Sequence, residues 1–144
     1  MDVFSREKRS QIMSRVSGKN TKPELIVRSL LHNMGYRFRL HRSDLPGKPD
    51  ITLPKYKKVI FVHGCFWHGH KDCRRSKRPA TNKKFWHEKL DKNIKRDKVN
   101  IRIFKELGWD VLIVWTCEVN DINQLKNKLL SFLEGKAKQK KSYV

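Results

Sequence analysis

The stretch from Val59 to Cys73 constrains this chain more than any other part of its sequence. Residues 59–62 form a short β-branched and aromatic run, which is typical of a strand packed on both faces. The segment 63–73 that follows holds two cysteines, three histidines and two large aromatic residues. Mixed α/β folds place working residues in loops at strand ends, because the sheet holds such loops still. We therefore interpret this loop as the functional centre, with a structural metal site and catalytic imidazoles.

The charge of the chain favours a polyanionic partner. Its 144 residues contain 34 Lys and Arg against 14 Asp and Glu, which gives a formal net charge of +20. The cations are spread over the whole length, so nucleic acid is the expected partner, with ribosomal-type and membrane-surface proteins as alternative classes. No apolar run approaches the length of a membrane span, and the first residues do not form a signal-peptide pattern. We therefore expect a cytoplasmic protein without a membrane partner.

Length and composition predict one α/β domain at residues 21–134, preceded by a mobile arm at 1–20 and followed by a disordered basic tail at 135–144. The arm either orders on a partner or is a frayed terminus. The expected elements are a helix at 21–35 with Leu25, Ile26, Leu30, Leu31 and Met34 as its apolar face, strands at 36–40, 51–53 and 59–62, a helix at 81–107 capped by Thr81, a strand at 109–115 and a helix at 120–133. A break near Val99 is an alternative to one continuous long helix.

The strand at 109–115 is apolar at nearly every position, which predicts a buried, central strand. A long helix joins it to the strand at 59–62, and such a crossover predicts that the two strands run parallel. Their C-terminal ends then lie on the same edge of the sheet, where Cys65 follows one strand and Cys117 follows the other.

Cysteine and histidine spacing predicts a zinc site at that edge. An odd count of three cysteines argues against a disulfide framework. Cys65, His70 and Cys73 lie within nine residues, and the parallel strand brings in Cys117, so that three thiolates and one imidazole complete the closed tetrahedral set that structural Zn²⁺ prefers. His68 competes with His70 as the imidazole ligand, and an ordinary buried thiol is the alternative interpretation of Cys117.

Asp50, His63 and His68 form a second candidate set. A carboxylate and imidazoles beside a basic surface suit phosphodiester hydrolysis, with Asp50 holding Mg²⁺ and an imidazole relaying protons. The alternatives are a turn cap for Asp50 and a core histidine for His63, and the hairpin register decides whether the two groups meet. Glu24, in the first turn of its helix, compensates the helix dipole in the simplest interpretation.

Three large aromatic residues accompany this set: Phe66, Trp67 and Trp86. Adjacent bulky rings in a glycine-flanked loop cannot both enter one core, so at least one of them is expected to face solvent. Exposed rings on a cationic protein stack on bases or wedge between base pairs, whereas packing over the metal loop is the alternative.

Several blocks together resemble the very short patch repair DNA mismatch endonuclease family. They are Leu45-Pro-Gly-Lys-Pro-Asp50, Phe61-Val-His-Gly-Cys-Phe-Trp-His68, Phe85-Trp-x-Glu-Lys with Asn93 and Arg96-Asp97, and Glu106-Leu-Gly-Trp-x-Val-Leu-Ile-Val-Trp-x-Cys117. The resemblance runs from about Arg9 to Cys117. It implies a restriction-endonuclease-like core, a mixed central sheet flanked by helices with a structural zinc site. It also implies a Mg²⁺-dependent enzyme that nicks duplex DNA 5′ of the thymine in a T·G mismatch left by deamination of 5-methylcytosine.

The resemblance also implies roles for individual residues. Asp50 and the Val62 carbonyl hold Mg²⁺, Glu24 contacts water bound to that ion, and His63 assists at the phosphate. The general acid/base is His68, oriented by Asp97. The residues implied in DNA intercalation are Phe66, Trp67 and Trp86, with Met13 of the arm closing on the minor groove, and those implied in zinc binding are Cys65, His70, Cys73 and Cys117.

We therefore expect a monomeric mismatch-nicking endonuclease, with mismatch-repair proteins and a companion cytosine methyltransferase as further partners. One alternative is a nicking endonuclease of the same fold that reads a fixed sequence and ignores mismatches. The other is a zinc-stabilised nucleic-acid-binding module without hydrolytic activity.

Overall fold

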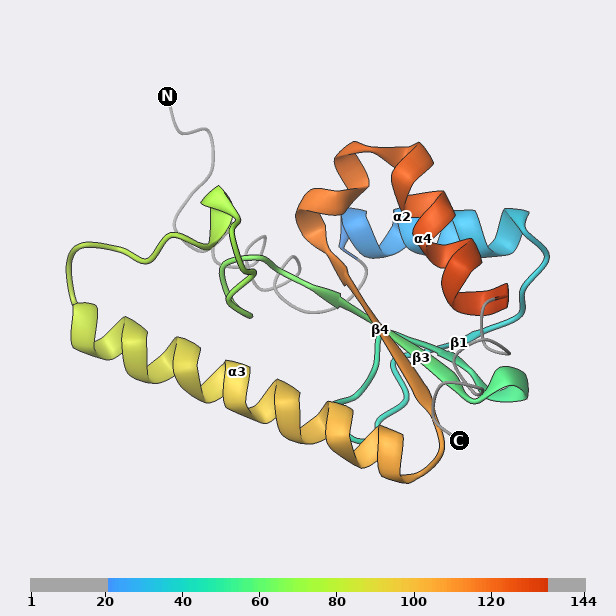
Figure 1. Cartoon of the computed structure of the whole chain (residues 1–144), viewed down its shortest axis with the longest axis horizontal. Coiled ribbons are helices and arrows are strands. Elements are labelled where there is room, and N and C mark those ends of the chain that lie inside the picture. The colour runs from blue at the N-terminus through green and yellow to red at the C-terminus, as the bar shows by residue number, and fades with distance from the viewer. Residues whose placement is uncertain (1–20, 135–144) are drawn as a thin grey trace, which may run out of the picture.

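The computed structural model describes residues 21–134, which form a sheet between layers of helices (Figure 1). The elements are α2 (Lys22–Asn33), β1 (Arg39–Leu40), β2 (Ile51–Leu53), β3 (Lys58–His63), α3 (Lys83–Glu106), β4 (Asp110–Trp115) and α4 (Ile122–Glu134), with short 3₁₀ turns at Pro54–Tyr56, Arg74–Ser76 and Thr116–Asn120. Helices α2 and α4 lie on one face of the sheet and α3 crosses the other. Within this part of the chain, no helix is both long enough and apolar enough to span a membrane.

The sheet has the strand order β1-β2-β3-β4. Strands β1, β2 and β3 pair in antiparallel fashion, whereas β3 and β4 run parallel with His63 opposite Trp115. The predicted hairpin and the predicted parallel crossover are therefore both confirmed. Because β2 runs against β3, the start of β2 and the ends of β3 and β4 meet at one edge of the sheet.

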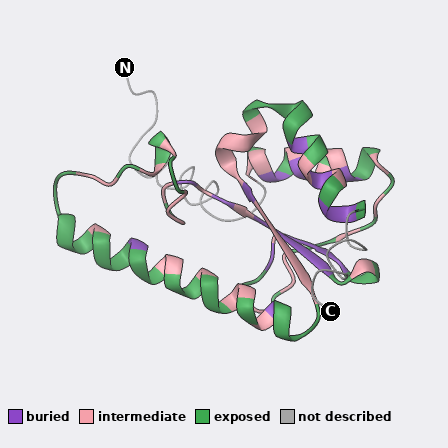
Figure 2. Cartoon of the chain, in the orientation of Figure 1, coloured by how far each residue is buried: buried purple, intermediate pink, exposed green. Residues whose placement is uncertain are grey.

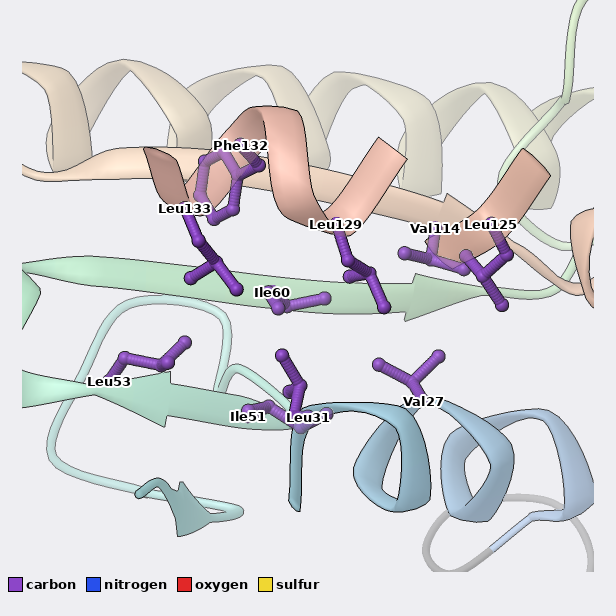
Figure 3. Close-up of a cluster of buried hydrophobic side chains, with 10 residues drawn as sticks. All are labelled: Val27, Leu31, Ile51, Leu53, Ile60, Val114, Leu125, Leu129, Phe132 and Leu133. Carbon is purple, nitrogen blue, oxygen red and sulfur yellow. The ribbon is translucent and has the colours of Figure 1, made fainter. Parts of the chain in front are cut away.

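The core lies on both faces of the sheet, as the two-residue period of a strand requires. Ile60 and Val114 point toward α2 and α4, while Val59 and Phe61 point toward Phe104 of α3. Figure 3 shows the larger cluster, in which the side chains from the two helices meet those of the strands. Its fully or largely buried members are Val27, Leu31, Ile51, Leu53, Ile60, Val114, Leu125, Leu129, Phe132 and Leu133.

Two strand predictions need correction. The strand expected at 36–40 is reduced to Arg39 and Leu40, both exposed, because only these two residues pair with β2. The strand expected to be central is β4, which pairs only with β3 among the described strands and is half-buried except at Val114 (Figure 2). Helices α3 and α4 cover the two faces of β4. Its apolar residues are therefore explained by helices packed on both faces, and a second neighbouring strand is not required.

Two helix predictions also change. Helix α3 is one continuous helix through Val99, as expected, but its N-cap is Asn82, at a φ of 54°, rather than Thr81. Helix α2 begins as expected, with the Thr21 side chain capping the Glu24 amide, but Leu25 is 47% exposed. The other expected residues do face the core: Leu31 is buried, and Ile26, Leu30 and Met34 pack against it. Val27 and Glu24 are buried on this face as well, so the Glu24 side chain turns toward the protein interior.

Candidate active site

A cleft of about 790 Å³ lies at the sheet edge where β2 begins and β3 ends. It is lined by α2, the segment before β2, the loop after β3 and the middle of α3. Glu24, Asp50, His63, His68 and Asp97 all line it, so the structure brings together the five residues that the sequence nominated for catalysis.

Asp50 and Val62 face each other across the hairpin. One carboxylate oxygen of Asp50 accepts a 2.7 Å hydrogen bond from the Val62 N–H. Continuing the β2–β3 register by two positions places Pro49 opposite Val62. In an antiparallel ladder the N–H and C=O of one residue point the same way, so the Val62 carbonyl faces the same side as its N–H. Pro49 has no N–H and therefore cannot donate a hydrogen bond to that carbonyl. A carboxylate and a strand carbonyl are thus available on one side, and these are the hard oxygen ligands that suit Mg²⁺.

Burial raises the pKa of Asp50 from its ordinary 3.8 to about 6. The hydrogen bond from the Val62 amide lowers this pKa, whereas the nearby Glu24 carboxylate raises it further. Two carboxylates held close together in a buried place repel each other and are poorly solvated. A divalent cation would relieve both penalties, so the donor set fits one.

Glu24 lies in the first turn of α2, yet it is only 1% exposed and faces the cleft. Its carboxylate contacts the His41 Nε2 atom at 2.6 Å and also bonds to Arg28. Ligand atoms of Glu24, His41 and Asp50 all lie within 4.8 Å of one another. Compensation of the helix dipole therefore does not account for Glu24 by itself, because its partners hold it at the cleft.

His41 was missed by the sequence reasoning. It follows β1, and continuing the β1–β2 register by one position places it opposite Asp50, whose carbonyl accepts a 3.2 Å bond from the His41 N–H. The pairing of β1 with β2 would have indicated His41 as a residue of the site, but the register of that pairing cannot be derived from the sequence.

His63 and His68 form a stacked pair beside Asp97. Their ring centroids are 3.8 Å apart and their planes differ by 8°. The His68 Nδ1 atom lies 2.6 Å from an Asp97 oxygen, and an ionised Asp97 holds the proton on Nδ1 and leaves Nε2 as an acceptor. Parallel rings cannot aim their in-plane lone pairs at one ion, so this pair is suited to proton transfer rather than to joint metal binding.

His63 is 5% exposed, and its Nδ1 atom has no hydrogen-bond partner among the described residues. Burial lowers the pKa of His63 to about 4, and the neighbouring His68 ring contributes to the decrease. The His63 ring is therefore neutral at pH 7.

We expect Asp50 and His63 to give the folded protein opposite pH dependences. The Asp50 contribution to stability is full below pH 3.8 and is lost as the pH rises through about 6. The His63 contribution is full above pH 6.5 and is lost as the pH falls through about 4. Between pH 4 and 6.5, His63→Gln should lose stability relative to wild type as the pH rises, and Asp50→Asn should gain it, each by up to roughly 3 kcal/mol.

Urea unfolding of the protein without added Mg²⁺, repeated across that pH window, measures both slopes. The difference from wild type at each pH isolates the single group, since all other titrations cancel. Two variant curves that stay parallel to the wild-type curve would show that neither group is perturbed by the fold.

Three aromatic rings from two segments form a cluster at the rim of the cleft. Phe66 lies 5.1 Å from Trp67 and 5.4 Å from Trp86, measured between ring centroids, and the two tryptophans are 5.9 Å apart. Trp67 lines the cleft and is 45% exposed, so at least one ring faces solvent as expected. Lys89 lies 6.0 Å from the Trp67 ring, which places a cation beside this exposed aromatic surface.

The four residues nominated for zinc, Cys65, His70, Cys73 and Cys117, also converge, with one ligand atom from each within 4.8 Å of the others. The cysteines are free thiols. Burial and the two neighbouring thiols raise the pKa of Cys117 to about 12, so three thiolates can share this space only with a cation among them. The residue types and their spacing fit tetrahedral Zn²⁺. His70 contributes the imidazole of this cluster, and His68 lies instead beside Asp97.

Met13 belongs to residues 1–20, and the basic tail begins at residue 135. Both lie outside the described residues, so the structure does not bear on the predictions made for them.

Comparison with solved structures places the chain among endonuclease catalytic domains. The "Homing Endonuclease I-Bth0305I Catalytic Domain" superposes with a TM-score of 0.53 at 26% sequence identity, covering 78% of this chain and 94% of that one. The mixed sheet flanked by helices is thus a fold that this chain shares with a nuclease catalytic domain.

Sequence comparisons identify the family. Residues 1–75 match the family model described as DNA mismatch endonuclease Vsr. The "Type II nicking enzyme V.XorIIP" of Xanthomonas oryzae pv. oryzae is 47% identical over 133 residues, 92% of this chain and 97% of that protein. The "DNA mismatch endonuclease Vsr" of Escherichia coli K12 is 42% identical over 130 residues, 90% of this chain and 83% of that protein. The chain belongs to the Vsr family and is an endonuclease of that DNA-repair family.

Proposed function

We propose that this endonuclease nicks duplex DNA on the 5′ side of the thymine in a T·G mismatch and depends on Mg²⁺. The observation that carries the proposal is the single cleft in which Asp50 lies on one wall and the His68–Asp97 pair on another, with Trp67 at its rim. A scissile phosphate in that cleft would have a hard-ion site and a proton-transfer group within reach at the same time.

In the proposed mechanism, surface lysines and arginines hold the DNA backbone, and the affinity falls steeply with salt. Asp50 and the Val62 carbonyl would hold Mg²⁺, which supplies charge stabilisation at the phosphoryl oxygens. His68 would take a proton from the attacking water at Nε2 and then give it up, to the leaving oxygen or to solvent, while Asp97 keeps its ring in one tautomer. His63, which is neutral at pH 7, lies against the His68 ring and assists at the phosphate. Glu24 orients water at the site.

Mismatch selectivity would come from the aromatic cluster of Phe66, Trp67 and Trp86. Inserting a ring between base pairs costs unstacking energy, and that cost is lowest beside a weakened pair. Residues 1–20, with Met13, are proposed to form an arm that closes on the minor groove. Residues 21–134 would be the endonuclease domain and 135–144 a basic tail.

We further propose that Cys65, His70, Cys73 and Cys117 hold a structural Zn²⁺, that the protein acts as a monomer in the bacterial cytoplasm, and that mismatch-repair proteins and a cytosine methyltransferase act alongside it. The donor chemistry of the thiol cluster supports the first of these. Family membership and the +20 charge support DNA as the substrate.

A second candidate is sequence-specific nicking without mismatch preference, which is favoured by relatives named as type II nicking enzymes, such as V.XorIIP. One end-labelled duplex with a T·G pair and its T·A twin, each with and without Mg²⁺, separates the candidates. We expect Mg²⁺-dependent nicking of the T·G duplex alone, on the thymine strand. Equal nicking of both duplexes would overturn mismatch selectivity, and tight binding without any nicking would leave only a binding module.

Trp67→Ala should reduce discrimination between the T·G and T·A duplexes by roughly tenfold, because one stacking ring is worth about 1–3 kcal/mol. Affinity for an undistorted duplex should change by no more than about twofold, since phosphate contacts supply most of it. Competition binding and single-turnover nicking measure the two quantities. Phe85→Ala is the matched control, because Phe85 is 56% exposed and touches Trp86 but does not line the cleft. Equal effects of both changes would show that Trp67 has no special part in recognition.

A further inference from the structure

Trp115 lies between the thiol cluster and the catalytic imidazoles. It is the last residue of β4 and stands opposite His63 in the strand register. Its indole stacks on the His70 ring, with centroids 4.2 Å apart and planes 9° apart, and it meets the His63 ring edge-on at 5.4 Å. His63 in turn stacks on His68. Four rings therefore run in unbroken contact from the cluster to the proton-transfer group.

We propose that Trp115 is a positioning residue for the His63–His68 pair and transmits the fixed geometry of the thiol cluster to it. The inference rests on the proposed function, in which His68 exchanges the proton at the cleft. It assigns the indole a part in the reaction that neither the charge nor the spacing of the sequence predicts.

Within residues 21–134, no hydrogen bond fixes the plane of the His63 ring. Its Nδ1 atom has no partner among the described residues, and rings surround it: His68 at 3.8 Å, Trp115 at 5.4 Å and Phe61 at 5.6 Å. Phe61 belongs to the core under α3, whereas Trp115 is the neighbour that touches the thiol cluster. Ring contacts must therefore set the orientation of His63, and through it the face on which His68 rests.

Trp115 is itself held firmly. Its backbone N–H donates a 2.7 Å hydrogen bond to the Glu118 carboxylate, and Glu118 is paired with Lys128 of α4 at 2.7 Å. Cys117, two residues farther on, belongs to the thiol cluster and lies 3.5 Å from His70 Nδ1. The backbone on one side of the indole and the stacked His70 ring on the other thus tie Trp115 to the cluster, and a rigid bicyclic ring has few other ways to move.

The test compares Trp115→Leu, which removes the ring, with Trp115→Phe, which keeps an aromatic face. Trp109→Leu is the matched control, since Trp109 is also half-buried beside β4 but packs on Phe104 at the strand end away from the cleft. For each protein we measure the single-turnover nicking rate at saturating DNA, the DNA dissociation constant, the zinc content, and the imidazole NMR signals of the DNA-free protein.

We expect Trp115→Leu to lower the single-turnover rate by roughly tenfold or more, as for small misplacements of catalytic groups, with DNA affinity within about twofold. Its zinc content should stay at the wild-type level, and the His63 and His68 ring signals should shift. Trp115→Phe should recover most of the rate, and Trp109→Leu should keep the wild-type rate and the wild-type histidine signals.

Three results would overturn the inference: unshifted histidine signals in Trp115→Leu, an equal rate loss in Trp109→Leu, or a rate loss that only follows loss of zinc. The rate is measured on whichever duplex the wild type nicks, and the NMR signals require no DNA. Failure of mismatch selectivity is therefore distinguishable from failure of the role assigned to Trp115.

Discussion

Asp50→Asn is expected to reduce single-turnover nicking by roughly a thousandfold or more, because it removes the carboxylate proposed to hold Mg²⁺ and leaves a neutral amide. The same change should raise the free energy of unfolding of the Mg²⁺-free protein at pH 7 by up to about 3 kcal/mol, since the buried carboxylate has its pKa raised to about 6. A loss of function accompanied by a gain in stability marks a group that the fold holds in place for chemistry.

Asp44→Asn is the matched control for this variant. Asp44 is another loop carboxylate before β2, but its side chain is 62% exposed and pairs with Arg42. We expect its nicking rate and its stability to stay close to wild type, as for most surface changes. Nicking by Asp50→Asn at the wild-type rate would remove Asp50 from the site.

Cys117→Ser should lose the bound zinc and destabilise the protein together. The change removes one of the four proposed ligands and leaves two thiols and an imidazole crowded around an incomplete site. Because zinc binding energy is also folding energy, we expect a fall in the free energy of unfolding of several kcal/mol, on the order of 3–5. Metal analysis of the purified protein and thermal unfolding measure the two effects.

The control for this variant is Ser76→Ala, since every cysteine of the chain already belongs to the cluster. The Ser76 hydroxyl donates to the carbonyls of His70 and Cys73, so its loss loosens the same loop without removing a ligand. It should keep its zinc and cost about 1 kcal/mol. A Cys117→Ser protein with the wild-type zinc content would show that Cys117 is only a buried core thiol.

Much of the site was predictable because chain topology alone brings its parts together. A strand, a long helix and a second strand require parallel pairing, and this placed Cys117 beside Cys65 across a gap of many residues. The hairpin between β2 and β3 turns at residues 54–56, where the sequence has Pro54. Turn residues and the order of strands and helices can both be predicted directly from the sequence.

The rest depended on register and on three-dimensional packing, which sequence patterns do not carry. β1 ends at Leu40, which pairs with Ile51, so the next residue, His41, comes opposite Asp50 and reaches Glu24. Among the described strands β4 lies at the edge, and helices cover both of its faces, so its apolar sequence is the same as that of a central strand. The sequence shows Trp115 only as the last residue of an apolar strand, and its contacts with the His70 and His63 rings are known from the structure alone.

Direct measurement of divalent-ion binding tests whether the edge around Asp50 is a metal site at all. Mn²⁺ stands in for Mg²⁺ and can be titrated by electron paramagnetic resonance into the zinc-loaded wild type and into Asp50→Asn and Asp44→Asn. We predict one Mn²⁺ site in the wild type and in Asp44→Asn, and its loss in Asp50→Asn. Equal Mn²⁺ binding by all three proteins would contradict a hydrolytic centre built on Asp50.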